Sequence, residues 1–114
     1  MAPQLFTIKK RATFVHIRDN GVMIRGNNIN IQKLIDQDLN NKIGVGYTAT
    51  KKIGNAVKRN KAKRRMRELV YSLKDRFKEF GYDYVLIARK NIVDKKFEDL
   101  KKDLNNTLKK MFPE

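Results

Sequence analysis

The segment from residue 51 to residue 67, KKIGNAVKRNKAKRRMR, carries the side chains best suited to chemistry with phosphates. Nine of these seventeen residues are Lys or Arg, and none is acidic. Arginine guanidinium groups form paired hydrogen bonds with phosphate oxygens, and asparagine side chains can bond a sugar hydroxyl or a base edge. Because like charges crowded onto one segment repel one another, we expect an external polyanion to compensate them.

Other kinds of chemistry have little support in the sequence. The chain has no cysteine and a single histidine, His16, so disulfides and thiolate metal sites are excluded. No nucleophile–base pair is recognisable, and the acidic residues are dispersed rather than clustered as two-metal hydrolysis requires. We therefore expect no protein-based catalytic residue and no metal site, and we expect His16 at the surface or at the edge of a cleft.

The charge of the whole chain also indicates a polyanionic partner. Its 114 residues carry a net charge of +15, and RNA, DNA or an anionic membrane surface would each fit that imbalance. No apolar run reaches the roughly 18 residues of a spanning helix, and the N-terminus lacks the apolar core of a secretory signal. We expect a cytoplasmic protein with one domain over residues 1–114.

Hydrophobic periodicity predicts the elements that position these side chains. The first five residues are expected to be loose and residues 35–42 to form a surface loop. The predicted elements are, in order, a helix over 8–18, strands over 22–25 and 29–33, a strand within 43–52, a helix over 55–80, a strand over 82–89 and a helix from residue 94. Thr7 and Asp94 are the expected N-caps, and Gly81 is expected just beyond the end of the long helix. The nearly continuous apolar run over 82–89 predicts a strand in the centre of its sheet. The last helix is expected to have one apolar face, formed by Phe97, Leu100, Leu104, Leu108 and Met111. This α-β-β-β-α-β-α order predicts an α+β sandwich.

On the long helix, the apolar and basic residues separate into different faces. The apolar stripe, spaced by three and four, consists of Ala62, Met66, Leu69, Val70, Leu73, Phe77 and Phe80. Arg59, Lys63 and Arg67 form one basic row, and Asn60 and Arg64 form the adjacent row. Asn55 lies one turn before Arg59, and Lys51 and Lys52 precede the helix. The free amides of the helix N-terminus add to an anion site there. A stripe of this kind indicates a packed helix rather than a disordered basic tail.

The strand before this helix has one face that is unusually small and polar. Val45, Tyr47 and Ala49 share one face, whereas Gly46, Thr48 and Thr50 share the other. A face of small polar residues covers a core poorly, so we predict that it forms the floor of a groove.

The alternative interpretation of the basic run is a solvated helix face, which is the usual explanation of a charge run. The run has a single sign, however, and this favours nucleic-acid binding. Charge does not decide between RNA and DNA.

Residues 46–69, GYTATKKIGNAVKRNKAKRRMREL, strongly resemble the signature of the bacterial ribonuclease P protein subunit family. The matching motif elements are Thr50-Lys51-Lys52, Gly54-Asn55-Ala56-Val57, Arg59-Asn60, Lys63-Arg64 and Arg67-Glu68. The resemblance implies a mostly four-stranded sheet with a left-handed βαβ crossover made by the basic helix, against the general right-handed rule. It also implies a large catalytic RNA that uses Mg²⁺, held by RNA and substrate, to remove the 5′ leader of precursor tRNA.

The resemblance further implies a role for each matching position. The residues expected to bind the catalytic RNA are Lys51, Lys52, Asn55, Arg59, Asn60, Lys63, Arg64 and Arg67. A cleft for the precursor-tRNA leader is expected between the first helix and the sheet, with Phe14 as a stacking residue and with Thr48 and Thr50 in its floor. One protein monomer per holoenzyme is expected.

The chain departs from the family pattern at two places. Family members often carry a second aromatic residue where this chain has Arg18, and another late in the second strand, where this chain has Ile31 and Gln32. Stacking of leader bases is therefore expected to be less secure than binding of the catalytic RNA. Phe14 also has a structural alternative, as a core residue of its helix.

Two other functional classes remain open from the residues. A ribosomal protein or RNA chaperone would explain the charge and the groove but would not require the motif over residues 50–68. A protein-only nuclease would require clustered carboxylates, which the sequence pattern does not supply.

Overall fold

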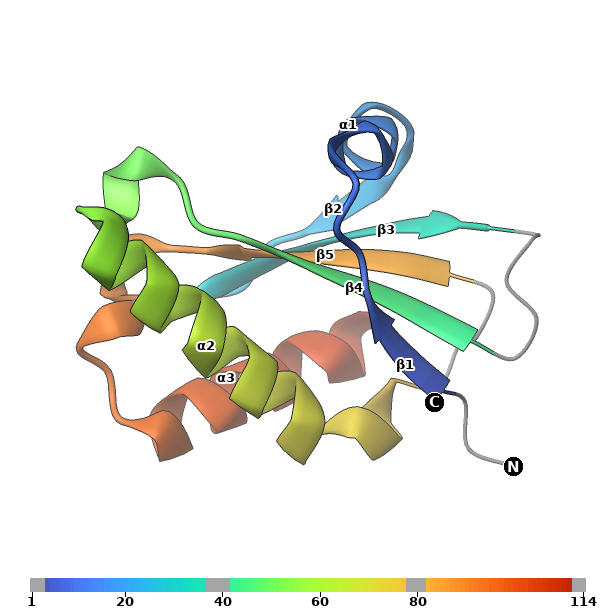
Figure 1. Ribbon diagram of the computed structural model, residues 1–114. Coiled ribbons are helices and arrows are strands. Elements are labelled where there is room, and N and C mark those ends of the chain that lie inside the picture. Colours follow the sequence, from blue (N-terminus) through green and yellow to red (C-terminus); the bar gives the residue numbers. More distant parts are fainter. Residues whose placement is uncertain (1–3, 37–41, 78–81, 112–114) are drawn as a thin grey trace.

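A five-stranded mixed sheet forms the centre of the computed structural model, which describes residues 4–36, 42–77 and 82–111 (Figure 1). The sheet order is β1-β4-β5-β3-β2. The strands are β1 (Gln4–Thr7), β2 (Val22–Ile24), β3 (Ile29–Ile35), β4 (Lys42–Thr48) and β5 (Tyr82–Ala88). β4 is parallel to both β1 and β5, whereas β3 is antiparallel to both β5 and β2.

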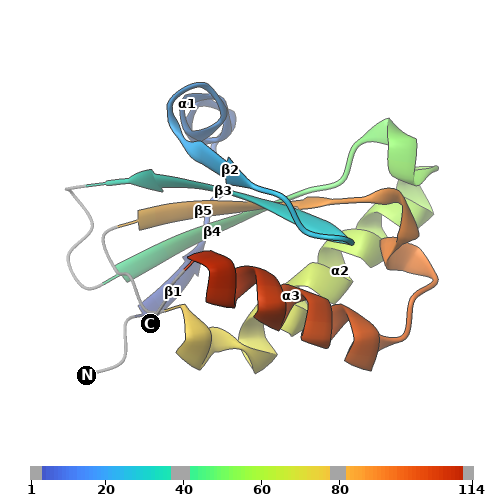
Figure 2. The ribbon, with the colours of Figure 1, turned by 180° about the vertical axis from the view of Figure 1, so that it is seen from behind.

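Helices cover both faces of this sheet (Figures 1 and 2). The helix α1 (Arg11–Asn20) lies on one face, and α2 (Ala56–Ser72) and α3 (Phe97–Met111) lie on the other. The main core lies between the sheet and the α2–α3 layer, and a smaller cluster around Ile8, Ile17 and Val85 lies beneath α1. The α+β sandwich predicted from the sequence is confirmed.

The apolar stripe of α2 faces the main core as predicted. Ala62, Met66 and Leu69 are fully buried, and Val70 is nearly so. The helix ends at Ser72 rather than continuing toward residue 80, and a 3₁₀ turn (η2, Lys74–Arg76) follows. Phe77 is still buried in the core. Its ring packs edge-on against the ring of Tyr84, with the ring centroids 5.5 Å apart. The predicted positions of Phe80 and Gly81 lie outside the described residues.

The prediction of a central strand over residues 82–89 is confirmed. β5 lies between β3 and β4, and it supplies side chains to both cores. Tyr84 and Leu86 pack in the main core, whereas Val85 packs beneath α1. A strand buried on both faces has a nearly continuous apolar sequence for this reason.

The prediction of a loose N-terminus was wrong for Gln4 and Leu5, and residues 1–3 lie outside the described residues. The strand Gln4–Thr7 pairs in parallel with β4, with Gln4 opposite Lys42 and Thr7 opposite Val45. This pairing adds a fifth strand to the four expected. Thr7 belongs to β1 and does not cap α1, which begins only at Arg11. Ile8 is buried in the link between them, where its amide bonds the carbonyl of Val45 at 2.9 Å.

The expected cap of the last helix was also wrong, although its apolar face was right. Asp94 ends a 3₁₀ turn (η3, Lys90–Val93), and α3 begins three residues later, at Phe97. The predicted face packs as expected: Leu100, Leu104, Leu108 and Met111 are buried.

The β4–α2–β5 connection is left-handed, as the family resemblance implies. In Figure 1, β4 runs from right to left, α2 returns beneath the sheet, and β5 runs from right to left again behind β4. Figure 2, the view from behind, shows the opposite depth order. Seen from the helix side with the strands pointing upward, β5 therefore lies to the left of β4. The usual right-handed rule has few exceptions, so sequence pattern alone would have predicted the opposite hand.

Within the described ranges, no helix is both long and apolar enough to cross a membrane.

Candidate nucleic-acid interface

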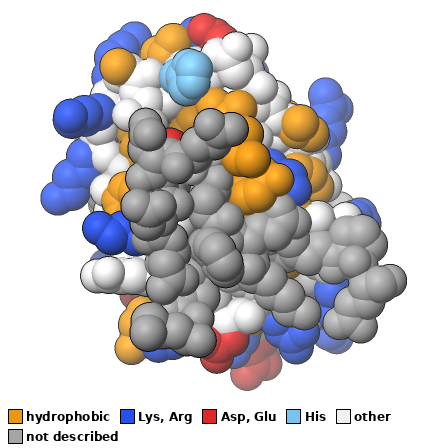
Figure 3. Space-filling view, turned by 90° about the vertical axis from the view of Figure 1, so that its right-hand side faces the viewer, with side chains coloured by type: hydrophobic (Ala, Val, Ile, Leu, Met, Phe, Trp, Pro, Cys, Tyr) orange, Lys and Arg blue, Asp and Glu red, His pale blue; other side chains and the backbone are white. Residues whose placement is uncertain are grey.

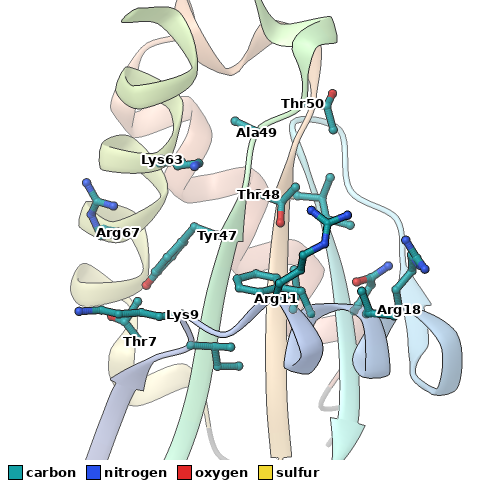
Figure 4. Close-up of a pocket in the computed structure, with 16 residues that line it drawn as sticks. Thr7, Lys9, Arg11, Arg18, Tyr47, Thr48, Ala49, Thr50, Lys63 and Arg67 are labelled. Atoms are coloured by element: carbon teal, nitrogen blue, oxygen red, sulfur yellow. The ribbon is translucent and has the colours of Figure 1, made fainter. Parts of the chain in front are cut away.

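A groove of about 800 Å³ lies between α1 and the sheet and opens toward α2 (Figure 4). Its position agrees with the predicted cleft, and the three predicted cleft residues line it. The lining consists of Thr7, Ile8, Lys9, Arg11, Phe14, Val15, Arg18, Gln32, Tyr47, Thr48, Ala49, Thr50, Lys63, Arg67, Val85 and Ile87.

The floor of the groove depends on a glycine beneath an aromatic ring. A Cβ atom on Gly46 would lie 2.5 Å from Cε1 of Phe14, so only a residue without a side chain allows the ring to lie so close to β4. Phe14 is half-buried, because it packs against the cluster beneath α1 and also lines the groove. The structural and functional interpretations of Phe14 are therefore compatible. Of the predicted small face, Thr48 and Thr50 line the groove, and Tyr47 and Ala49 of the opposite face line it as well.

Cations approach the groove from both sides (Figure 4). Lys9, Arg11 and Arg18 extend from α1 and the segment before it, and Lys63 and Arg67 extend from α2. No acidic side chain is among the described residues that line the groove. Such a channel attracts the backbone of a single-stranded nucleic acid. Lysine and arginine side chains also lie along the margins of the face shown in Figure 3, so the positive charge extends beyond the groove.

Two polar residues that line the groove, Gln32 and Tyr47, were not among the predicted site residues. Gln32 is only 8% exposed, and its amide makes no hydrogen bond to any described residue. Because Gln32 lines the open groove, its amide can still meet water there and is available to hydrogen-bond a ligand. The sequence marked this position only as a departure from the family pattern, where Ile31 and Gln32 replace a common aromatic residue.

Tyr47 lies at the α2 side of the groove, where its ring points between Lys9 and Arg67 (Figure 4). Burial raises the pKa of its phenol to about 12, against a smaller lowering effect of the Arg67 charge. The hydroxyl therefore stays protonated at neutral pH and can donate a hydrogen bond. Strand alternation assigned Tyr47 to the core face, and it does pack against the main core. Because it lies one residue before the end of β4, it also reaches the groove.

Asn55 is the N-cap residue of α2. Its Oδ1 accepts a hydrogen bond from the Lys58 amide at 3.0 Å, so it caps the helix. Gly54 has a φ of 138°, which favours glycine. Lys51 and Lys52 lie in the preceding 3₁₀ turn (η1, Lys51–Ile53) and are exposed. The predicted phosphate contacts of these residues are sterically open.

The other predicted RNA-binding residues of α2 divide between two places. Lys63 and Arg67 line the groove, whereas Arg59, Asn60 and Arg64 lie elsewhere on the helix surface. Arg64 is 64% exposed and approaches Glu68 at 3.9 Å. Arg64 also lines a second hollow, of about 470 Å³, on another flank of α2. Its lining consists of Lys61, Arg64, Arg65, Glu68, Val93, Asp94, Lys95 and Phe97.

Arg65 differs from the basic residues around it. Its guanidinium donates to the backbone carbonyls of Ile92 at 2.6 Å and Val93 at 2.9 Å, and also to that of Lys95. These bonds attach α2 to η3. Arg65 is therefore a structural residue within a basic segment, and it lies outside the predicted RNA-binding set.

A buried carboxyl lies on the same sheet face as the groove but outside its lining. Asp83 on β5 is buried and faces Gly44, whose Cβ would lie 2.3 Å from Oδ1 of Asp83. Burial, with the hydrogen bond and the charge of Asp36, raises the pKa of Asp83 to about 7. Within the described ranges, no three His, Cys, Asp or Glu side chains converge as metal ligands would.

Comparison with known proteins gives consistent matches. A family model described as Ribonuclease P matches residues 2–112. The ribonuclease P protein component of Gluconacetobacter diazotrophicus is 36% identical over 110 residues, which cover 96% of this chain and 94% of that protein. The corresponding Bacillus mycoides protein is 36% identical over 103 residues, covering 90% and 88%.

Solved structures match over similar lengths. The Staphylococcus aureus RNase P protein aligns with a TM-score of 0.80 at 28% identity, covering 94% of this chain and 95% of that one. The RNase P protein from Thermotoga maritima aligns with a TM-score of 0.78 at 25% identity, covering 92% and 96%.

Proposed function

The chain belongs to the ribonuclease P protein component family, and from that premise we propose that it binds a catalytic RNA and the 5′ leader of precursor tRNA. Membership implies an RNA partner in a ribonucleoprotein endoribonuclease of tRNA processing. In our proposal the RNA performs the cleavage, and the protein strengthens the binding of substrate and metal ions.

The observation that carries the proposal is the groove with Phe14 on its floor and cations on both sides. Single-stranded RNA binds where a positive channel follows the backbone and an aromatic ring receives a base. Here the hydroxyls of Thr48 and Thr50 add hydrogen bonds, and the Gln32 amide supplies a donor and an acceptor where the family often has an aromatic residue. We therefore propose that this groove holds the leader more by hydrogen bonds and charge than by stacking.

The remaining predicted residues form the proposed surface for the catalytic RNA. Arg59, Asn60 and Arg64 lie on α2 outside the groove, and Lys51, Lys52 and Asn55 lie at its N-terminal end. Lys63 and Arg67 face the groove, where we propose that leader and catalytic RNA meet. Each phosphate contact releases counterions, so binding should weaken steeply as salt increases.

We propose that the magnesium ions of the reaction are held by the RNA and the substrate. Mg²⁺ prefers carboxylate and phosphate oxygens, and the described groove lining has phosphate-binding cations instead of carboxylates. When bound, Mg²⁺ would activate the attacking water and stabilise developing negative charge. The protein would contribute by holding the leader strand in place and by offsetting phosphate repulsion. We further propose one protein monomer per holoenzyme, acting in the cytoplasm.

The test is leader removal from precursor tRNA at low Mg²⁺, with protein alone, catalytic RNA alone, and both together. We expect cleavage by the RNA to increase markedly when the protein is added and no cleavage by the protein alone. Cleavage by the protein alone would indicate a protein-only nuclease. Tight RNA binding without any gain in cleavage would indicate a general RNA-binding protein.

A further inference from the structure

Tyr71 is a large aromatic residue on the surface of α2, with its side chain 71% exposed. Its neighbours Leu69, Val70 and Leu73 are buried, and Tyr71 belongs to neither core cluster. Packing therefore does not explain an aromatic residue at this position.

The position of Tyr71 on the helix connects it with the groove. It lies four residues after Arg67 and eight after Lys63, so it continues the basic row of α2 by one turn. Because an α-helix rises 1.5 Å per residue, Tyr71 lies about 6 Å beyond Arg67 along the axis. Both Lys63 and Arg67 line the groove, and a strand that leaves the groove past Arg67 would meet Tyr71 next.

Charges of both signs lie near Tyr71 in the sequence, with Glu68 and Asp75 within four residues, but the charge at the ring itself is positive. Nζ of Lys74 lies over the ring, 4.8 Å from its centroid. The row of Arg59, Lys63, Arg67 and Tyr71 contains no acid, whereas the neighbouring row pairs Arg64 with Glu68. A base stacked on Tyr71 would place its phosphates near two cations.

We propose that Tyr71 is a stacking platform for an unpaired base of an RNA strand that leaves the groove along α2. The proposal rests on the proposed function, because it requires RNA in the groove. Unpaired bases stack on exposed aromatic side chains largely without regard to their identity. The strand can belong to the leader or to the catalytic RNA, and the tests below distinguish these two sources.

The first test uses fluorescence, because the chain contains no tryptophan. The Tyr71→Trp variant places a single indole at an exposed site, and a base stacked on it should quench its emission. The variant is titrated with catalytic RNA, and the assembled holoenzyme is then titrated with precursor tRNA carrying a long leader. Inorganic polyphosphate, which has charge but no bases, serves as the control. We expect quenching in one of the two RNA steps and none with polyphosphate.

The second test measures affinity in the holoenzyme. Tyr71→Ala should weaken binding of one RNA about tenfold, within the range measured for base–aromatic stacking, and Tyr71→Phe should retain wild-type affinity. Loss only for precursor tRNA with a long leader, and not with a truncated one, assigns the base to the leader. Loss of protein affinity for the catalytic RNA assigns it to that RNA. Val22→Ala, which truncates an exposed apolar side chain on the distant edge strand β2, is the matched control and should change neither affinity.

The proposal is overturned if the indole emission is unchanged at saturating RNA, if polyphosphate quenches it equally, or if Tyr71→Ala binds both RNAs as the wild type does. The proposed function would survive each of these results. If the wild-type protein bound neither RNA, the proposed function itself would fail, so the two failures are distinguishable.

Discussion

Two adjacent arginines of α2 should affect different properties when mutated: Arg65 the stability of the fold, and Arg64 the binding of RNA. Arg65 donates to backbone carbonyls of Ile92, Val93 and Lys95, and Arg65→Ala leaves these acceptors without their donor. Hydrogen bonds to charged groups contribute roughly 1.5–3 kcal/mol each. The site is only partly buried, so water can hydrogen-bond the carbonyls when the guanidinium is removed. We therefore expect each lost hydrogen bond to lower the free energy of unfolding by about 1 kcal/mol. The free energy of unfolding should therefore fall by about 2–3 kcal/mol.

Arg64→Ala is the matched control one residue away. Arg64 is 64% exposed and only 3.9 Å from Glu68, so its removal should change stability by less than about 0.5 kcal/mol. It should weaken binding to the catalytic RNA and lower the slope of log affinity against log salt by about 0.7–0.9, the loss of one phosphate contact.

The assays are urea unfolding followed by circular dichroism, and RNA binding at several salt concentrations. In thermal unfolding, Arg65→Ala should lower Tm by roughly 10 °C. The folded fraction of this variant should bind the catalytic RNA with the same salt dependence as the wild type. If Arg65→Ala were as stable as the wild type, or if Arg64→Ala left the salt slope unchanged, the assignment of one arginine to structure and the other to RNA would be wrong.

Three further predictions concern the sheet face beneath α1. The pKa of Asp83 is raised to about 7 in the folded chain. The folded state therefore binds an extra proton between about pH 4 and 7, and stability falls as pH rises through that window. Asp83→Asn should flatten this pH dependence in urea unfolding from pH 5 to 8, and an unchanged pH profile would contradict the raised pKa of Asp83. In Gly46→Val, the valine side chain should collide with the Phe14 ring. This should lower the free energy of unfolding by about 1–3 kcal/mol and weaken leader binding. Wild-type stability would show that the ring moves freely. Gln32→Leu should keep close to the wild-type stability in urea unfolding, because the amide makes no hydrogen bond to a described residue, yet it should bind the leader several-fold more weakly. Equal leader affinity would remove Gln32 from the site.

Local periodicity was sufficient to predict much of the fold. The stripe of α2, the apolar face of α3 and the double burial of β5 follow from spacings of three, four and two residues. The small face of β4 likewise predicted a groove floor before any geometry was known. These features depend on near neighbours in the chain.

Features that depend on distant partners were missed. β1 has only four residues, and its strand character comes from pairing with β4, some forty residues later. Helical spacing separated Arg64 from Arg65, but it could not show that η3 approaches Arg65 and gives it carbonyl partners. Gln32 and Tyr47 were missed as site residues because the other walls of the groove come from distant segments of the chain.

The strand order of the sheet has a consequence for synthesis on the ribosome. β3 pairs with β2 and β5, and β4 pairs with β1 and β5, so the two halves of the sheet join only through β5. A nascent chain that ends before Tyr82 can form at most two separate ribbons of two strands, and such ribbons are marginal in water. The described sheet should therefore assemble late, after β5 has left the exit tunnel, when pairings distant in sequence finally become possible.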